Sequence, residues 1–146
     1  MNSKFIYRIK EFYILETFQV AYYRSQLSAL TDEYHIKAFE KIITTEDTHA
    51  QFFADMIGKA NLELPSLTGT LFDFAGEILG ESAESISETN GLKLAVMLEK
   101  KAAATYRDFI SEAKAFPVIH HALMEYLLDE EFHILWLDNY VHSRAQ

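Results

Sequence analysis

The stretch TTEDTHAQFF, residues 44–53, lies in a long run of helical apolar spacing, yet it carries Glu46 and His49 where apolar side chains are expected. Later in the chain, LDEEFHILWL (128–137) repeats this arrangement with Glu130 and His133. Residues three apart share one face of a helix, so each pair directs a carboxylate and an imidazole toward the same neighbour. The repeated Glu-x-x-His motif therefore decides how the fold is interpreted.

The chain contains only two prolines and five glycines, and its apolar residues recur at helical spacing in the long intervals between them. Thr31 and Thr89 are candidate N-caps, and Pro117 is typical of a first helical turn. This pattern predicts an all-α chain with one domain over 1–146 and helices over about 3–30, 32–60, 90–114 and 117–143.

The spacing between the predicted helices sets their connectivity. The first two helices, and likewise the last two, are separated by a few residues, so each pair is expected to form an antiparallel hairpin. The interval 61–88 is long enough to cross a bundle and contains LFDFAGEILG (71–80), which predicts a short extra helix. A four-helix bundle with one long crossover is the ferritin-like topology.

Each predicted helix interrupts its apolar stripe once with a carboxylate. The four interruptions are Glu16, Glu46, Glu99 and Glu130. Counted from the turn of each predicted hairpin, Glu16 lies level with Glu46, and Glu99 lies level with Glu130. With the two histidines, the sequence predicts a pseudo-twofold set of six metal ligands: Glu16, Glu46, His49, Glu99, Glu130 and His133.

Electrostatics favours metal ions within this set. Four ionised carboxylates in a core would each cost several kcal/mol unless protons or cations offset their charge, and two divalent metals supply four positive charges. Glutamate and histidine ligands suit iron, with manganese and zinc as alternatives. A chain without cysteine has no ligands for an iron–sulfur centre or a thiolate zinc site. The competing interpretation is a bundle with hydrogen-bonded polar pairs in its core, because a single Glu-x-x-His motif is common by chance.

Two further residues are candidates for a supporting role near the metals. Asp129 precedes Glu130 and is a candidate acceptor for a ligand histidine, although a solvated face explains it equally well. Tyr106 follows Glu99 by two turns on the same stripe, where a core tyrosine is the simpler explanation. No catalytic residue beyond the metal ligands is indicated.

Charge and hydropathy limit the classes of partner that this protein is expected to bind. The net charge is −9 and no cluster of Lys and Arg exceeds a pair, so a nucleic-acid partner is not expected. The first residues, MNSKFIYRIKEFY, lack the apolar core of a signal peptide, and no window of eighteen residues is free of charge. We therefore expect a cytoplasmic protein without a membrane partner, and a homodimer is compatible with the sequence.

Over about 5–140, the chain resembles the ferritin-like di-iron carboxylate proteins, which include rubrerythrins, bacterioferritins and demethoxyubiquinone hydroxylase. The resemblance rests on Glu16, Glu46-x-x-His49, Glu99 and Glu130-x-x-His133. It implies a non-haem di-iron oxidoreductase that activates or reduces oxygen or hydrogen peroxide, with Glu46 and Glu130 bridging the metals. The pattern is specific for such a site and much less specific for the reaction, because one fold hosts many chemistries.

Differences between this chain and individual members of the group refine the expected function. A rubrerythrin-like chain without a cysteine-ligated iron domain needs an external electron donor protein. Asp47 stands where the resemblance to bacterioferritin would place a haem-ligating methionine, so no haem is expected. The long interval before Glu99 resembles that of demethoxyubiquinone hydroxylase, but the acidic 71–80 segment is a poor match to an anionic membrane surface. A related monooxygenase, a ferroxidase or iron-handling protein, and a non-catalytic helical interaction module remain alternatives.

Overall fold

The computed structural model describes residues 2–67 and 91–145. These residues form four α-helices and no β-strand, so the predicted all-α class is confirmed for them and is consistent with a helical bundle. The helices are α1 (Ser3–Leu27), α2 (Glu33–Lys59), α5 (Gly91–Glu112) and α6 (Pro117–Ala145), with a 3-10 turn, η1 (Ala113–Ala115), between the last two. The predicted short helix over 71–80 and the candidate cap Thr89 lie outside the described residues.

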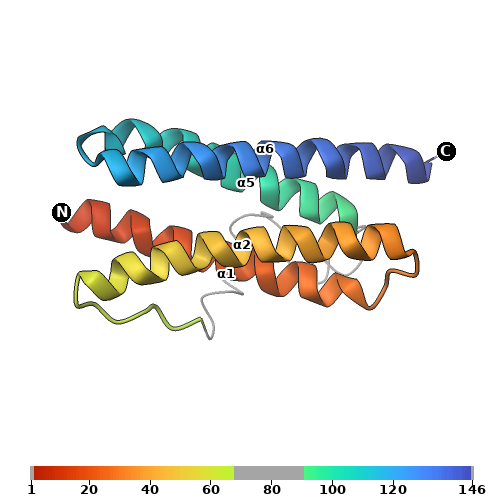
Figure 1. Ribbon diagram of the computed structural model, residues 1–146, viewed down its shortest axis with the longest axis horizontal. Helices are drawn as coiled ribbons and strands as arrows, with labels where there is room; N and C mark the ends of the chain where they lie inside the picture. Colours follow the sequence, from red (N-terminus) through yellow and green to blue (C-terminus); the bar gives the residue numbers. More distant parts are fainter. Residues whose placement is uncertain (1, 68–90, 146) are drawn as a thin grey trace. The chain divides into compact units, whose positions relative to one another are not determined.

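The chain divides into two compact units, one holding α1 and α2 and the other holding α5 and α6. Within each unit the two helices pack against each other along their lengths and run in opposite directions (Figure 1). Both predicted hairpins are therefore present.

The ends of α1 and α2 are set by local hydrogen bonds. Asn2 caps α1, since its side chain accepts from the backbone N–H of Phe5 at 2.8 Å. The predicted cap Thr31 is wrong by one residue: Asp32 is the N-cap of α2 and accepts from the backbone N–H of His35. A carboxylate at this position also interacts favourably with the positive end of the helix dipole, which favours Asp32 over its neighbour.

A left-handed residue ends α2. Asn61 has φ 56°, and the N–H of Leu62 donates to the carbonyl of Ile57 at 3.1 Å. The N–H of Asn61 donates to the carbonyl of Gly58 at 2.9 Å, which completes a Schellman motif. The helix therefore stops within a residue of the predicted end at 60.

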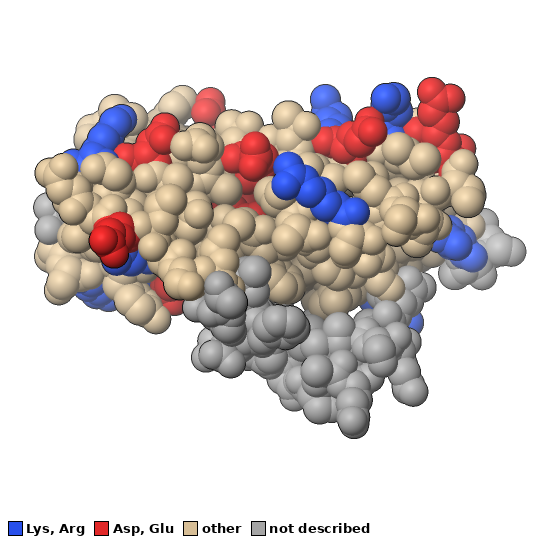
Figure 2. Space-filling view, turned by 90° about the horizontal axis from the view of Figure 1, so that it is seen from below, with Lys and Arg blue, Asp and Glu red and all other residues tan. Residues whose placement is uncertain are grey.

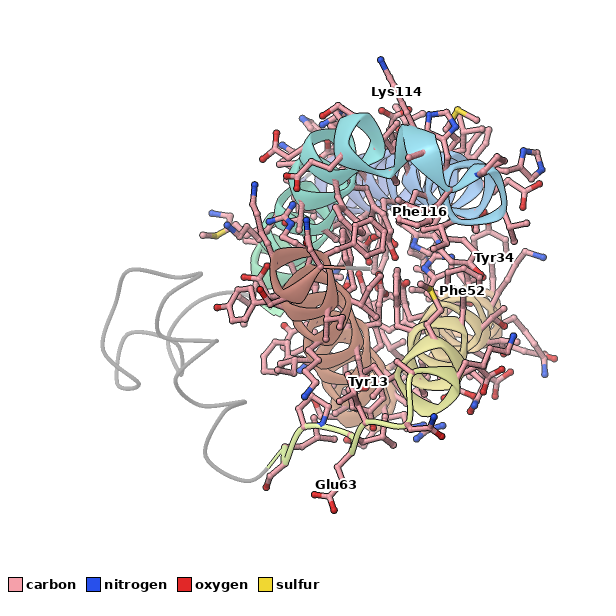
Figure 3. The ribbon with its side chains drawn as sticks, turned by 90° about the vertical axis from the view of Figure 1, so that its left-hand side faces the viewer. Tyr13, Tyr34, Phe52, Glu63, Lys114 and Phe116 are labelled. Atoms are coloured by element: carbon pink, nitrogen blue, oxygen red, sulfur yellow. The ribbon has the colours of Figure 1, made fainter. Side chains whose placement is uncertain are left out.

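The connection between α5 and α6 is a short turn. In η1 the N–H of Phe116 donates to the carbonyl of Ala113 at 2.8 Å, and α6 begins at Pro117 as the sequence predicts. Lys114 points away from the helices, as does Glu63 beyond the end of α2 (Figure 3).

Aromatic side chains set the register of the first hairpin. Phe12 of α1 stacks on Phe53 of α2 with ring centroids 4.9 Å apart, and Tyr23 meets Phe39 edge-on at 5.5 Å. All four side chains are buried. The segment of α1 between Phe12 and Tyr23 therefore faces the segment of α2 between Phe39 and Phe53.

The second hairpin has a comparable anchor. Tyr106 of α5 meets Tyr126 of α6 edge-on with centroids 6.2 Å apart. On the outside of the same hairpin, Arg107 donates to Glu131 at 2.7 Å. Because Tyr106 and Tyr126 oppose each other, residues two turns before Tyr106 lie level with residues two turns after Tyr126.

Charges on the described surface are mixed in sign. On the face shown in Figure 2, Lys and Arg side chains lie among Asp and Glu side chains. None of the helices in the described part of the chain has an apolar stretch long enough to cross a membrane.

Candidate metal centre

The first hairpin brings together three of the predicted ligands. Glu46 and His49 lie one turn apart on α2, so both point toward α1. Glu16 lies on α1 one turn beyond Phe12, whose ring fixes the level of α1 against Phe53 of α2. Helical spacing and aromatic register thus place the three side chains at one height in the hairpin.

These three side chains form a compact group. The Nδ1 of His49 lies 3.1 Å from Oε2 of Glu46 and 3.5 Å from Oε2 of Glu16. One ligand atom from each of the three residues lies within 4.8 Å of the other two. Glu16 and Glu46 are fully buried, and His49 is 1% exposed. We call Glu16, Glu46 and His49 the first triple.

The second hairpin builds an equivalent group, the second triple, from Glu99 of α5 with Glu130 and His133 of α6. The Nδ1 of His133 lies 3.3 Å from Oε2 of Glu99, and one ligand atom of each residue lies within 4.8 Å of the other two. Glu99 and Glu130 are fully buried, whereas the His133 side chain is 12% exposed. The level match between Glu99 and His133 follows from the Tyr106–Tyr126 contact two turns away.

Both triples follow one plan. In each, a histidine lies one turn after a glutamate on the second helix, and its Nδ1 lies close to a glutamate oxygen on the first helix. The structure therefore places all six predicted ligands in two groups of three, each within its own hairpin.

The donor set of each triple suits a divalent cation. Two buried carboxylates carry negative charge that costs several kcal/mol to bury without compensation. An imidazole nitrogen and carboxylate oxygens are typical ligands of iron, manganese and zinc, and the chain has no cysteine to supply a thiolate. Each triple could thus hold a metal ion.

The two supporting candidates fall in different environments. Tyr106 is fully buried, and its ring contacts Tyr126, which agrees with the simpler interpretation of a core tyrosine. Asp129 precedes Glu130 in α6 and is half-buried. Its predicted role as an acceptor for a ligand histidine stays a prediction.

The sequence interpretation missed one buried polar residue, Gln19 of α1, which is fully buried. It lies three residues after Glu16 and four before Tyr23, so it shares their face of the helix. The sequence interpretation continued the stripe from Glu16 directly to Val20 and so omitted Gln19. The signal was present, because a residue at i+3 from one stripe member and i−4 from the next belongs to the same stripe.

Comparison of the chain with protein-family models, with curated proteins and with solved structures gave no match in any of the three.

Proposed function

We propose that this protein is a non-haem di-iron oxidoreductase that reacts with oxygen or hydrogen peroxide, and that the two triples together hold two iron ions. The observation that supports this most is the repetition of one buried Glu/Glu/His group on two hairpins of the same chain. A single such group has many explanations, but two built on the same plan match the ligand requirement of a dinuclear centre.

The contacts across each hairpin suggest a division of the ligands between the metals. His49 lies near Glu16, and His133 lies near Glu99, so each histidine and its glutamate on the neighbouring helix would serve one metal. The remaining carboxylates, Glu46 and Glu130, would complete the ligand set, in the role that the resemblance to ferritin-like proteins implies for them. The proposed set then offers one imidazole to each metal, and its four carboxylates would balance two divalent charges.

The chemistry that iron would supply here is transfer of two electrons to an O–O bond. Reduction of hydrogen peroxide to two water molecules consumes two electrons and two protons. In the proposal, the buried glutamates hold the metals and keep their charge compensated, and the buried, stacked rings of Phe12 and Phe53 pack one turn from Glu16. A chain without cysteine has no iron–sulfur centre of its own, so the electrons would come from an external donor protein.

Metal content and oxidation would test this function. Protein purified without oxygen is expected to contain about two irons per chain by elemental analysis, in line with a dinuclear ligand set. Addition of air or peroxide should produce near-ultraviolet absorption bands of ferric iron. Two manganese ions would move the assignment to that metal, whereas no metal or a single zinc ion would refute the proposal.

The alternative reactions have separate readouts. A large hollow oligomer by size-exclusion chromatography, with iron retained after oxidation, would indicate an iron-handling protein. Oxidant consumption that depends on an added organic compound would indicate a monooxygenase. Catalytic turnover of peroxide with a reductant alone is the result expected from the proposed function.

A further inference from the structure

Helix α6 carries large apolar side chains on its exposed side as well as its buried side. Met124, Leu128, Phe132 and Leu135 are 39%, 53%, 66% and 61% exposed. Their spacing of four, four and three residues places them on one face of a helix. At 100° per residue, this face lies opposite the one that carries Leu123, Glu130 and Leu137, all of which are fully buried. We call the four exposed residues the α6 stripe.

The α6 stripe is large enough to matter energetically. At about 200 Å² for each large apolar side chain, the four exposed fractions amount to roughly 440 Å² on one chain. This area lies within the range of the largest apolar patch on a typical monomer, about 300–600 Å², and such patches are often functional. Two such faces together, with the residues at their rims, approach the lower range of a specific protein–protein interface.

We propose that the α6 stripe is a dimer interface, on which α6 of a second copy of this chain packs in antiparallel orientation. The stripe of one copy can face the same stripe of a second copy when the two helices run in opposite directions. The alignment that sets Leu128 against Phe132 of the second copy also brings Met124 within one residue of Leu135, and the same pairs recur in reverse order. This reciprocity is what a twofold interface requires of a single surface.

The charged side chains beside the α6 stripe are compatible with a second copy of the chain as the partner. In the same alignment His120 lies level with Tyr140 of the second copy. Asp138 lies two residues away, about 3 Å along the axis, on the same side of the stripe, so a histidine and a carboxylate lie near each other across the contact. The two glutamates beside the stripe already have partners within the chain: Glu125 lies 3.3 Å from His121, and Glu131 lies 2.7 Å from Arg107. These partners reduce the repulsion between like charges that a twofold contact would otherwise create.

The molecular mass in solution tests the proposal directly. Sedimentation of the full chain should give the mass of a dimer, and Phe132→Glu should give a monomer with an unchanged far-ultraviolet circular dichroism spectrum. Val118→Glu is the matched control, because Val118 is also an exposed apolar residue of α6 but lies outside the stripe. The control should remain dimeric. A monomeric wild-type protein, or a Phe132→Glu variant that stays dimeric, would overturn the proposal.

The orientation is tested by cross-linking, for which the absence of native cysteine is convenient. A mixture of Met124→Cys and Leu135→Cys chains should form mixed cross-linked dimers with a short thiol-reactive linker, and neither variant alone should cross-link well. Efficient cross-linking of each variant with itself would instead show a parallel contact and overturn the antiparallel arrangement. Neither test depends on metal content, so failure here leaves the proposed function standing.

Discussion

His49 and Glu16 meet across the α1–α2 hairpin with Nδ1 of the histidine 3.5 Å from Oε2 of the glutamate. The equivalent distance between His133 and Glu99 across the α5–α6 hairpin is 3.3 Å. Because the two members of each pair come from antiparallel helices, a metal held between them would link both helices of its hairpin. Metal binding and hairpin stability are therefore expected to depend on each other.

Removal of one of the proposed metal ligands should abolish the proposed dinuclear binding. Glu46→Ala removes a fully buried carboxylate that lies 3.1 Å from His49, and His133→Ala removes the imidazole of the other triple. We expect either variant to lose the two-metal stoichiometry of the wild type, as measured by elemental analysis of anaerobically purified protein. Two metals per chain in either variant would refute the ligand assignment.

Glu40→Ala is the matched control for Glu46→Ala. Glu40 lies on the same helix, and its exposed side chain pairs with Lys37 at 3.2 Å. Removing such a surface pair changes stability by about 1 kcal/mol or less. This variant should keep the wild-type metal content, so a loss of metal in both variants would point to helix destabilisation instead of ligand removal.

Glu16→Gln should change the stability of the apo protein and of the metal-loaded protein in opposite directions. Without metal, removing one buried negative charge from the first triple should raise the midpoint of thermal unfolding, because a buried carboxylate is costly unless it is compensated. With metal, the loss of a ligand should lower that midpoint. Thermal unfolding followed by circular dichroism, with chelator and with added Fe²⁺ under anaerobic conditions, measures both effects. A lowered midpoint in chelator would contradict the charge argument.

The two buried Glu/His groups were predictable from the sequence because helical geometry fixes what residues three or four apart can reach. The apolar stripe of α1 runs through Phe12 and resumes at Val20, so a buried position for Glu16 followed from the pattern alone, as the structure shows. The interatomic distances were not predictable. They depend on rings such as Phe12 and Phe53, whose stacking sets the axial level of one helix against the other.

Helix ends were predicted less well, because several residues compete for each cap. Thr31 and Asp32 are both good N-cap residues, and the sequence does not decide which backbone N–H each one reaches. At the other end of the same connection, α1 stops at Leu27 and not at the predicted residue 30. Nothing in the apolar pattern marks this difference, because Leu30 continues the stripe.

The cap assignment gives a stability prediction. Asp32→Ala removes the acceptor for the backbone N–H of His35 and should lower the free energy of unfolding by about 1 kcal/mol. Thr31→Ala lies one residue outside the helix and should change the free energy of unfolding by less than about 0.5 kcal/mol. Urea unfolding of the two variants compares them directly. An equal or larger loss for Thr31→Ala would indicate that Thr31, the residue predicted from the sequence, is the N-cap of α2.

The aromatic contact beside Glu16 should be a major source of hairpin stability. Phe12→Ala removes a fully buried ring that stacks on Phe53, and such a truncation costs about 3–5 kcal/mol. Tyr7→Ala on the same helix removes a side chain that is 64% exposed and should cost far less. Urea midpoints of the two variants should differ accordingly. Similar losses for both would mean that the Phe12–Phe53 contact does not anchor the hairpin.

Tyr22 should make the protein less stable in alkaline solution. Burial raises the pKa of its hydroxyl from 10.0 to about 12, and its ring lies beside those of Phe18 and Tyr23. Between about pH 10 and pH 12, the unfolded chain has lost this proton while the folded chain retains it, so the free energy of unfolding falls as pH rises. Tyr22→Phe removes this contribution and should flatten the fall.

Urea midpoints at about pH 8 and about pH 11 measure this dependence, because a group contributes to the slope only between its unfolded and folded pKa values. Tyr7→Phe serves as the control, since Tyr7 is largely exposed and lies on the same helix. Deprotonation of lysines affects both variants and the wild type alike, so it cancels in the comparison. Tyr22→Phe should lose less stability between the two conditions than the wild type and Tyr7→Phe. Equal losses in all three proteins would show that the hydroxyl of Tyr22 ionises as readily in the folded chain as in the unfolded one.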